Sequence, residues 1–485
     1  MSFAERCGVH DRARAAACEA LQRRLHDERI ERVRIAWCDL HGLLRGKTLM
    51  AGALAAALDD GVGLVATTLL KDSSDRTVFK VFEPGLDRSL TGATAGFAGA
   101  GNLLLLPDPA RFTTLPWAPG TGWLPAQPWF ADATPVPQDT RRVLQQALAA
   151  LAAAGYGMVC GLEVEFHVYR IVETRLDPAL ADWPGEPPAV EMVHPGYLLL
   201  GEAWADLGDE VLQIVQRTAQ GLGLPLRSLE IELGPSQFEA VFDAMDALQA
   251  ADAMVLFRNG VRQALRRAGY HASFVCRPPF PNVMASGWHL HQSLRHLDDG
   301  ANAFSDPQAP LSPTGRQWLA GLLAHARAAT VFGTPTVNGF GRFRPGALAP
   351  MAVRWGHDNR GAMLRLVGQP GDPGSRIENR VGEPAANPYL YIASQVHAGL
   401  DGLRRGLQPP PPTDAPYAEP DEPAGRLPTS LAEALDALLD DRLLVQAMGA
   451  DAVEVFVRAK RQEVARAEAA DDPDRWQRRE YFSRF

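Results

Sequence analysis

The sequence predicts an α+β fold in which a mostly antiparallel sheet carries helices on its outer side. Four short stretches place charged or imidazole side chains at every second position: residues 163–165, 230–232, 289–291 and 376–380. Residues two apart in a strand point to the same face, so each stretch predicts a strand with one polar and one apolar face. Three Ala- and Leu-rich segments have the spacing of amphipathic helices: residues 140–154, 248–268 and 315–332. Together these patterns predict a sheet whose concave polar face binds cations and anions.

The N-terminal part of the chain has the pattern of a small β-rich unit. Residues 11–29 are predicted to be helical, and residues 33–39 to form a strand that turns at 41–42. Three further pieces resemble strands: residues 64–70, 77–82 and 103–107. A proline-rich stretch then predicts a linker. We therefore expect an N-terminal domain over residues 1–122, a linker over 123–138 and a larger domain over 139–485.

Towards the C-terminus the sequence again predicts helices. Residues 408–412 include four consecutive prolines, and together with 417–428 they predict an extended surface segment. Residues 431–444 and 451–467 follow as two predicted helices.

Length and composition indicate a globular protein. The 485 residues exceed one ordinary core, which favours two domains. The net charge of −9 argues against nucleic acid as a partner, and no apolar run is long enough to cross a membrane. The five cysteines form no CxxC pair, as expected of reduced thiols in the cytoplasm.

The predicted polar face contains the side chains that divalent cations prefer. Mg²⁺ and Mn²⁺ take oxygen ligands, and Mn²⁺ also accepts imidazole. Enough such ligands for two metals are present: Glu163, Glu165, Glu232, Glu239, Glu378 and His289. Nearby arginines would neutralise phosphate oxygens during phosphoryl transfer: Arg342, Arg360, Arg365, Arg376 and Arg380. A P-loop, a GxGxxG motif and a GxSxG elbow are all absent from the sequence, so a nucleotide would be held by metals and arginines.

Seven motifs in this order resemble the signatures of the glutamine synthetase family. They cover residues 161–166, 232–239, 286–294, 335–342, 358–365, 376–380 and 387–390. The resemblance runs from about residue 30 to the end of the chain. It implies a β-grasp N-terminal domain, a catalytic domain with a curved antiparallel sheet, and a homo-oligomer of stacked rings, a dodecamer. It also implies ATP and glutamate as substrates, two or more Mg²⁺ or Mn²⁺ ions per site, and active sites between neighbouring subunits.

The same resemblance implies a role for each matched residue. Glu165, Glu232 and Glu239 would bind one metal, and the second metal would be bound by Glu163, His289 and Glu378. Glutamate and its γ-phosphate would be held by Arg342 and Arg380, with Ala285 and His289 beside them. Arg342, Arg380 and Glu378 would be catalytic. The ATP-binding residues would be His291, Ser293, Arg360, Arg365 and Arg376.

The sequence departs from ammonia-using members at the acceptor end. Leu348 stands where those members have a glutamate that closes the site and takes a proton, and leucine can do neither. The usual Asp-Gly-Ser-Ser motif is altered, so that either Lys71 or Asp72 occupies the ammonium position. Met284 and Trp288 replace more usual residues and predict a more apolar pocket.

These departures favour an organic amine as the acceptor. We expect a ligase that forms γ-glutamyl phosphate and passes it to an apolar amine, such as aniline. The alternatives are a γ-glutamylpolyamine or γ-glutamylethanolamide synthetase, an ammonia-dependent glutamine synthetase, and a catalytically silent relative.

Overall fold

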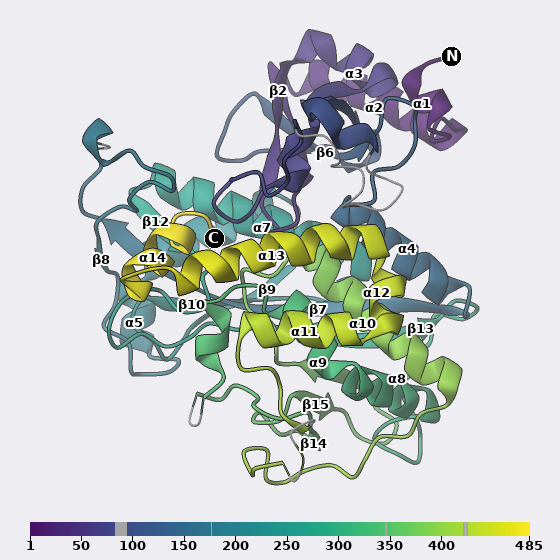
Figure 1. The fold of residues 1–485 in the computed structure, drawn as a ribbon, viewed down its shortest axis with the longest axis vertical. Helices are drawn as coiled ribbons and strands as arrows, with labels where there is room; N and C mark the ends of the chain where they lie inside the picture. Colours follow the sequence, from purple (N-terminus) through teal and green to yellow (C-terminus); the bar gives the residue numbers. More distant parts are fainter. Residues whose placement is uncertain (83–94, 176, 345–346, 421, 423–424) are drawn as a thin grey trace.

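Two β-sheets organise the chain in the computed structural model, which describes residues 1–82, 95–175, 177–344, 347–420, 422 and 425–485. The smaller sheet lies in the N-terminal part, and the larger sheet with most of the helices forms the rest of the molecule (Figure 1). Among the described residues, no helix has the length and apolar character needed to cross a membrane.

The first sheet has the strand order β2-β1-β6-β4-β3, with β5 paired to β6. Its strands are β1 (Arg32–Cys38), β2 (Leu44–Met50), β3 (Val62–Val65), β4 (Asn102–Pro107), β5 (Thr113–Thr114) and β6 (Thr121–Trp129). The helices of this part are α1 (Phe3–Arg6), α2 (Arg12–Asp27) and α3 (Leu54–Asp60). β1 and β6 run parallel, and the other pairs are antiparallel.

Two expectations for this part need correction. The segment 123–138 is not all linker, because β6 extends to Trp129 and buries Leu124 and Ala126 in the hydrophobic core of the N-terminal part. Two of its four prolines, Pro125 and Pro128, lie within β6, where the strand pairs with β1 and β4. Residues 77–82 form no strand and make only one bridge, from Thr77 to Lys71. The division of the chain into domains stays a prediction.

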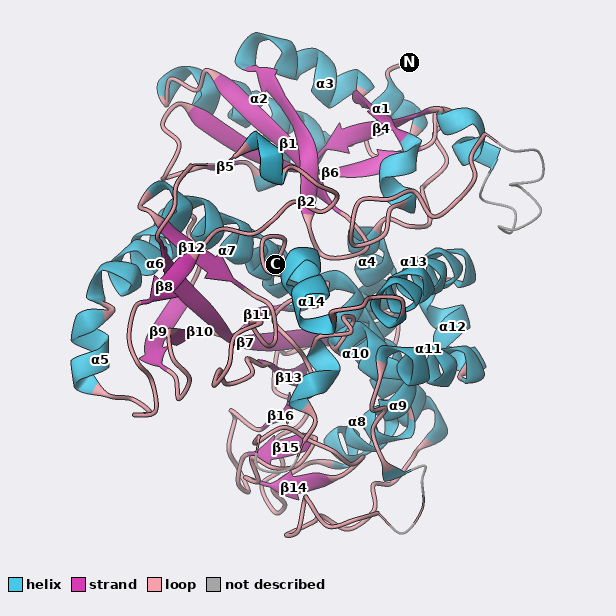
Figure 2. Ribbon diagram, turned by 60° about the vertical axis from the view of Figure 1, so that its left-hand side comes forward, coloured by secondary structure: helices cyan, strands magenta, loops and turns pink. Residues whose placement is uncertain are grey.

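The second sheet is mostly antiparallel, as predicted, with the order β14-β15-β16-β13-β7-β10-β9 (Figure 2). Its strands are β7 (Tyr156–Ile171), β8 (Val190–Met192), β9 (Leu226–Ile231), β10 (Gln237–Phe242), β11 (Met245–Asp246), β12 (Tyr270–Ser273), β13 (Trp288–His296), β14 (Trp355–His357), β15 (Leu364–Val367) and β16 (Arg376–Asn379). The long strand β7 pairs with β13, β10 and the three short strands β8, β11 and β12.

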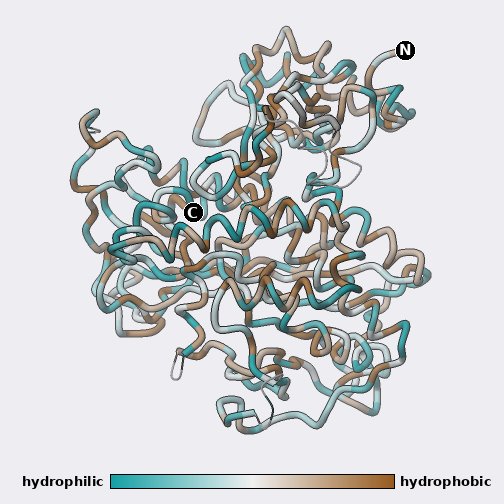
Figure 3. Tube along the Cα trace, in the orientation of Figure 1, coloured by the Kyte–Doolittle hydropathy of each residue, from teal (hydrophilic) through white to brown (hydrophobic). Residues whose placement is uncertain are grey.

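Helices make up much of the rest of this part of the chain. They are α4 (Thr140–Ala152), α5 (Glu202–Leu207), α6 (Asp209–Gly221), α7 (Ala247–Arg267), α8 (Pro313–Ala324), α9 (Ala326–Gly333), α10 (Pro388–Arg405), α11 (Leu431–Asp440), α12 (Arg442–Met448), α13 (Ala450–Glu468) and α14 (Pro473–Tyr481). Most of α10 is buried. Along α13, hydrophilic and hydrophobic residues alternate as expected of a helix with one buried face (Figure 3).

Two of the predicted helices are each divided by one polar residue. The segment 315–332 breaks at His325, and the segment 431–444 breaks at Asp441. These two residues are hydrogen-bonded to each other, with His325 Nδ1 2.5 Å from Asp441 Oδ2. Asp441 also caps α12 by accepting the Leu444 backbone N–H. Amphipathic spacing predicts which residues are helical but not such a break, because the break depends on a partner far away in sequence.

Candidate active site

The predicted alternation of polar and apolar side chains is present in the second sheet. In register, Glu163 of β7 lies opposite His289 of β13, and Glu165 lies opposite Glu239 of β10. The intervening residues point into the core, where Val164 and Leu290 are fully buried. Strand pairing therefore gathers carboxylates and imidazoles from separate motifs onto one face.

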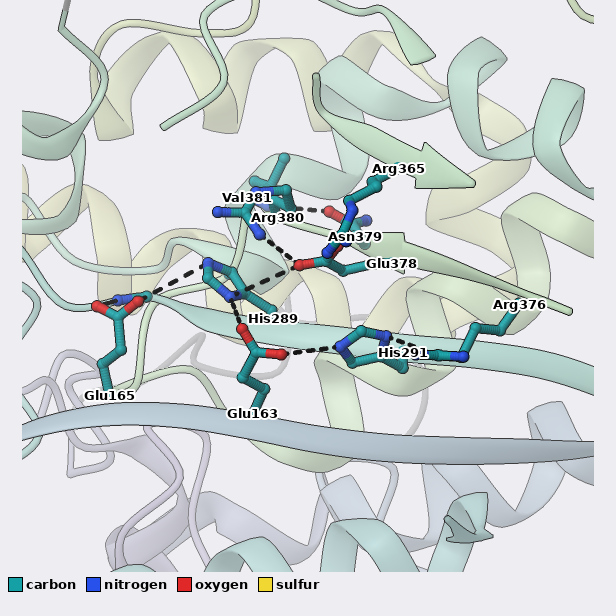
Figure 4. A network of polar contacts seen from close by, with 12 residues as sticks. Glu163, Glu165, His289, His291, Arg365, Arg376, Glu378, Asn379, Arg380 and Val381 are labelled. Atoms are coloured by element: carbon teal, nitrogen blue, oxygen red, sulfur yellow. Dashed lines mark hydrogen bonds and ion pairs between the residues drawn. The ribbon is translucent and has the colours of Figure 1, made fainter. Parts of the chain in front are cut away.

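One predicted metal-binding set is gathered at a single point. Glu163, His289 and Glu378 each offer a ligand atom, and these atoms lie within 4.8 Å of one another (Figure 4). His289 Nδ1 is 2.7 Å from Glu163 Oε1 and 3.7 Å from Glu378 Oε1. Burial and the charge of Arg380 lower the pKa of His289 to about 4, so its ring is neutral at pH 7. A neutral imidazole is the form that binds a metal.

The second predicted set is a cluster of three carboxylates. Ligand atoms of Glu165, Glu232 and Glu239 also lie within 4.8 Å of one another. Burial and the neighbouring charge of Glu232 raise the pKa of Glu165 to about 8. Burial and four nearby carboxylates, Glu163 first and then Glu165, Glu232 and Glu230, raise the pKa of Glu239 to about 10. Carboxylates crowded in this way are stabilised by a cation, and oxygen donors of this kind fit Mg²⁺ or Mn²⁺.

Two arginines lie beside the first set. Arg342 is buried, and its Nη1 donates to the carbonyl oxygens of Arg380 and Gly382 at 3.0 and 3.1 Å. Its Nη2 lies 3.3 Å from His289 Nε2. Arg380 pairs with Glu378, which also accepts from Arg365 at 3.0 Å (Figure 4). Both guanidinium groups are therefore held in place next to the carboxylates.

The residues predicted to bind ATP share one cavity of about 670 Å³. It is lined by His291, Ser293, Arg360, Arg365 and Arg376, together with Glu163 of the first set. Arg376 Nε donates to His291 Nδ1 at 3.2 Å (Figure 4). Arg227 and Arg295 also line it, and a cavity of this size with five arginines has room and charge for a nucleotide.

Sequence reasoning missed one polar residue in the site. Gln237 donates from Nε2 to Glu165 Oε2 at 3.2 Å and to Ser286 Oγ at 3.0 Å. It thereby links the carboxylate cluster to the 284–286 segment that includes Ala285. A signal was available, because Gln237 lies two residues before Glu239 and so shares its face of β10.

The predicted apolar acceptor residues are arranged differently from expectation. Trp288 lines no open pocket, because it is fully buried on the core side of β13 and packs edge-on against Tyr391 at 5.1 Å. The pleat that directs His289 to the site necessarily directs Trp288 away from it. Leu348 is 59% exposed, and Met284 lies against Gly234, two residues after Glu232. Leu348 and Met284 therefore remain candidates for contact with the acceptor.

The 71–75 loop lies apart from both acidic sets within one chain. Asp72 is buried; its Oδ1 accepts the backbone N–H groups of Ser74 and Arg76, and its Oδ2 lies 3.2 Å from Arg466 Nε. The Lys71 carbonyl oxygen lies 3.0 Å from His41 Nε2.

This loop is anchored by a buried ion pair that makes stability depend on pH. Glu480 accepts from Ser73 Oγ and Ser74 Oγ and from both terminal nitrogens of Arg466. Burial acts to raise the pKa of Glu480, but the Arg466 contacts outweigh it and lower the pKa from 4.5 to about 2. We expect Glu480→Gln to lower the free energy of unfolding by about 3 kcal/mol at pH 7.

The pH dependence of that loss identifies its cause. Since the folded pKa lies below the unfolded one, the stabilisation is complete above about pH 4.5 and is lost as pH falls towards 2. Urea unfolding at several pH values should show the variant and the wild type converging at acidic pH. Glu191→Gln, which removes an exposed carboxylate 3.6 Å from Arg170, should change stability little at any pH. A constant gap between wild type and Glu480→Gln from pH 7 to pH 3 would contradict the assignment.

Comparisons with known proteins agree with this geometry. Residues 137–481 match the family model of the glutamine synthetase catalytic domain. The chain is 39% identical over 469 residues to a gamma-glutamylanilide synthase from Acinetobacter sp, covering 94% of this chain and 93% of the relative. It is 30% identical over 477 residues to a gamma-glutamylethanolamide synthetase from Streptomyces coelicolor, covering 98% of each. A solved structure of GmaS without ligand superposes with a TM-score of 0.76 at 28% identity, covering 95% of this chain and 98% of that one.

Proposed function

This chain belongs to the glutamine synthetase family, and from that premise we propose that it is an ATP-dependent ligase that joins glutamate to an organic amine. The observation that carries the proposal is the contrast between the two ends of the site. Both acidic sets and the arginines are assembled, whereas the acceptor end has Leu348 in place of a proton-accepting carboxylate. The residues that would activate glutamate by phosphoryl transfer are therefore retained, and those that would bind ammonium are not.

In this proposal the two acidic sets each hold a divalent cation, Mg²⁺ or Mn²⁺, which neutralises the charge of the ATP phosphates when bound. The protein contributes the ligands in a fixed arrangement. Gly287 N–H donates to Glu165 Oε2 at 2.9 Å, and Arg365 holds Glu378 at 3.0 Å, so neither carboxylate has to be ordered on binding. Such supporting contacts orient metal ligands and are costly to lose.

The arginines orient the reacting groups. Arg342 binds a carboxylate of glutamate, and Arg380 stabilises negative charge as the γ-phosphoryl group passes from ATP to the glutamate γ-carboxylate. ADP is the leaving group, and γ-glutamyl phosphate is formed. The amine nitrogen then attacks the γ-carbonyl carbon, inorganic phosphate leaves, and the nitrogen loses one proton to give the amide.

We propose an apolar aromatic amine, such as aniline, as the acceptor. Aniline is neutral at pH 7, so it needs no carboxylate to bind it as a cation or to remove a proton before attack. Leu348 would give it an apolar contact. The similarity to a gamma-glutamylanilide synthase supports this choice, and the similarity to a gamma-glutamylethanolamide synthetase makes ethanolamine the main competitor.

The test is phosphate release in the presence of ATP, glutamate and a divalent cation, with one amine at a time. Ammonium, methylamine, ethanolamine, putrescine, isopropylamine and aniline should be supplied at equal concentrations. Aniline should be the best acceptor and ammonium a poor one. Preference for ammonium would overturn the amine-ligase proposal, whereas preference for ethanolamine or putrescine would overturn only the aromatic acceptor.

We further propose that the active molecule is a homo-oligomer of stacked rings. Four consecutive large apolar side chains, at residues 197–200, are each more than 50% exposed in the single chain. Contiguous apolar surface of this kind is typical of a protein interface. This run lies against the end of β9, directly before Glu232 of the carboxylate cluster, since the Leu200 backbone N–H donates to the Ile231 carbonyl oxygen. A neighbouring copy would therefore cover the edge of the site.

The role proposed for Arg342 is tested by Arg342→Lys. Lysine provides a point charge in place of a planar fork, so it cannot hold the backbone carbonyl oxygens and a substrate carboxylate together. We expect a folded enzyme whose KM for glutamate rises about tenfold or more. The matched control is Arg344→Lys, which changes an exposed arginine in the same loop. Equal glutamate saturation in wild type and Arg342→Lys would show that Arg342 does not bind glutamate.

A further inference from the structure

The loop that carries Arg342 is fastened to the segment that follows β16. Arg342 Nη1 donates to three successive carbonyl oxygens of residues 380–382. From the beginning of the same loop, Thr334 Oγ1 donates to the Val381 carbonyl oxygen at 2.9 Å. The Glu383 backbone N–H donates to the Gly333 carbonyl oxygen, also at 2.9 Å. The position of the Arg342 guanidinium therefore depends on how loop 334–342 sits against residues 380–383.

A buried carboxylate that no proposed role uses lies at this junction. Glu383 is 1% exposed and accepts from Thr336 twice, from the backbone N–H at 2.9 Å and from the hydroxyl at 2.9 Å. Thr336 Oγ1 in turn accepts the Gly339 backbone N–H at 3.0 Å. One carboxylate thus holds two points of the loop, Thr336 directly and Gly339 through the threonine hydroxyl.

The packing at this junction leaves little freedom. A Cβ atom at Gly339 would lie 2.5 Å from Thr334 Cγ2 and 2.7 Å from Glu383 Oε2, closer than such atoms come. The far side of the loop is held separately by α14, where Asn338 donates to Gln477 Oε1 at 2.7 Å. Asn338 also exchanges two hydrogen bonds with the backbone of Arg277. Among these attachments, the one through Glu383 adjoins the carbonyl oxygens that hold Arg342.

We propose that Glu383 and Thr336 are positioning residues for Arg342, and through it for glutamate. Hydrogen bonds from the Glu383 carboxylate through the Thr336 hydroxyl to the Gly339 N–H fix the position of Arg342 relative to the carbonyl oxygens of residues 380–382. Loss of these hydrogen bonds shifts the guanidinium and weakens glutamate binding, while the ATP cavity, which residues 334–342 do not line, is unaffected. The inference rests on the proposed function, because it assumes that Arg342 binds glutamate.

The test compares Thr336→Val with Thr336→Ser. Valine has nearly the shape of threonine but leaves Glu383 without its hydroxyl donor and the Gly339 N–H without its acceptor. We expect the KM for glutamate to rise about tenfold in Thr336→Val, by the usual cost of unpaired buried groups, with the KM for ATP changed less than about twofold. Thr336→Ser keeps the hydroxyl and should restore most of the glutamate affinity. A purely structural role would lower stability without separating the two KM values.

Two further measurements separate the possible outcomes. If Thr336→Val does not fold, Thr336→Ala, which removes the same hydroxyl from Glu383 and Gly339, should show the same separation of the KM values. In a double-mutant cycle, Thr336→Val should add little to the effect of Arg342→Lys, because both act through one guanidinium. Two results would overturn the inference, provided that wild-type turnover saturates with glutamate. One is a folded Thr336 variant whose KM values for glutamate and ATP are unchanged or equally raised. The other is a double mutant in which the effects of Thr336→Val and Arg342→Lys add fully. No glutamate-dependent turnover in the wild type would overturn the proposed function as well.

Discussion

Glu239→Gln should lower glutamate-dependent phosphate release by about a hundredfold or more, the usual effect of losing a group that holds a metal. Glutamine has the same shape but offers a neutral oxygen, so the cluster with Glu165 and Glu232 would lose one of the three carboxylates that can bind a cation. The same loss should make the metal-free protein more stable, because burial and like charges already raise the pKa of Glu239 to about 10. Steady-state assays and thermal unfolding in chelator measure the two effects.

The opposite signs of these effects make the experiment specific. Wild-type protein should gain thermal stability when Mn²⁺ is added, and Glu239→Gln should gain much less. The matched control is Glu230→Gln, since Glu230 lies in register with Glu239 but outside the cluster and bonds with Ser228 at 3.0 Å. The control should keep most of its activity and its response to Mn²⁺. Near-normal turnover in Glu239→Gln would contradict the two-metal assignment.

The part of the site that the sequence could predict is the part built by strand periodicity. Glu163, Glu165 and His289 alternate with residues that are buried in the structure, and the register then brings separate motifs together. Periodicity alone says that each strand has a polar face, and the family resemblance was needed to say which strands share it. The two acidic sets lie where that resemblance placed them, whereas their metal-binding roles remain predictions.

The features that sequence reasoning missed depend on partners distant in sequence. Trp288 was expected beside the acceptor, but it lies two residues before the buried Leu290 and so shares its core-facing side of β13. Pro125 and Pro128 favoured a linker where β6 instead forms an inner strand of the first sheet. Glu383 and Thr336 are 47 residues apart, so neither spacing nor composition could have linked them. Local patterns predict faces and elements, and tertiary contacts decide which side chains meet.

Leu348→Glu should shift acceptor preference towards ammonium by about a hundredfold relative to aniline, the typical value of a positioned general base. A carboxylate at this position can attract ammonium and take a proton from it, whereas leucine does neither. Leu348 has a backbone φ of +51° and is 59% exposed, so glutamate meets the same backbone strain and ready access to water. Phosphate release measured with each amine at saturating ATP and glutamate gives the ratio of kcat/KM values.

The control for this change is Leu348→Ala. Alanine keeps a Cβ and hence a similar backbone strain, but it removes the apolar contact without adding a base. We expect it to weaken the reaction with aniline and to leave the reaction with ammonium unimproved. If Leu348→Glu and Leu348→Ala behave alike, the position contributes only apolar contact, and the missing carboxylate does not explain the acceptor. If neither variant changes the ratio, other residues select the acceptor. Met284 is then the next position to test, because it lies against Gly234, two residues after Glu232 of the carboxylate cluster.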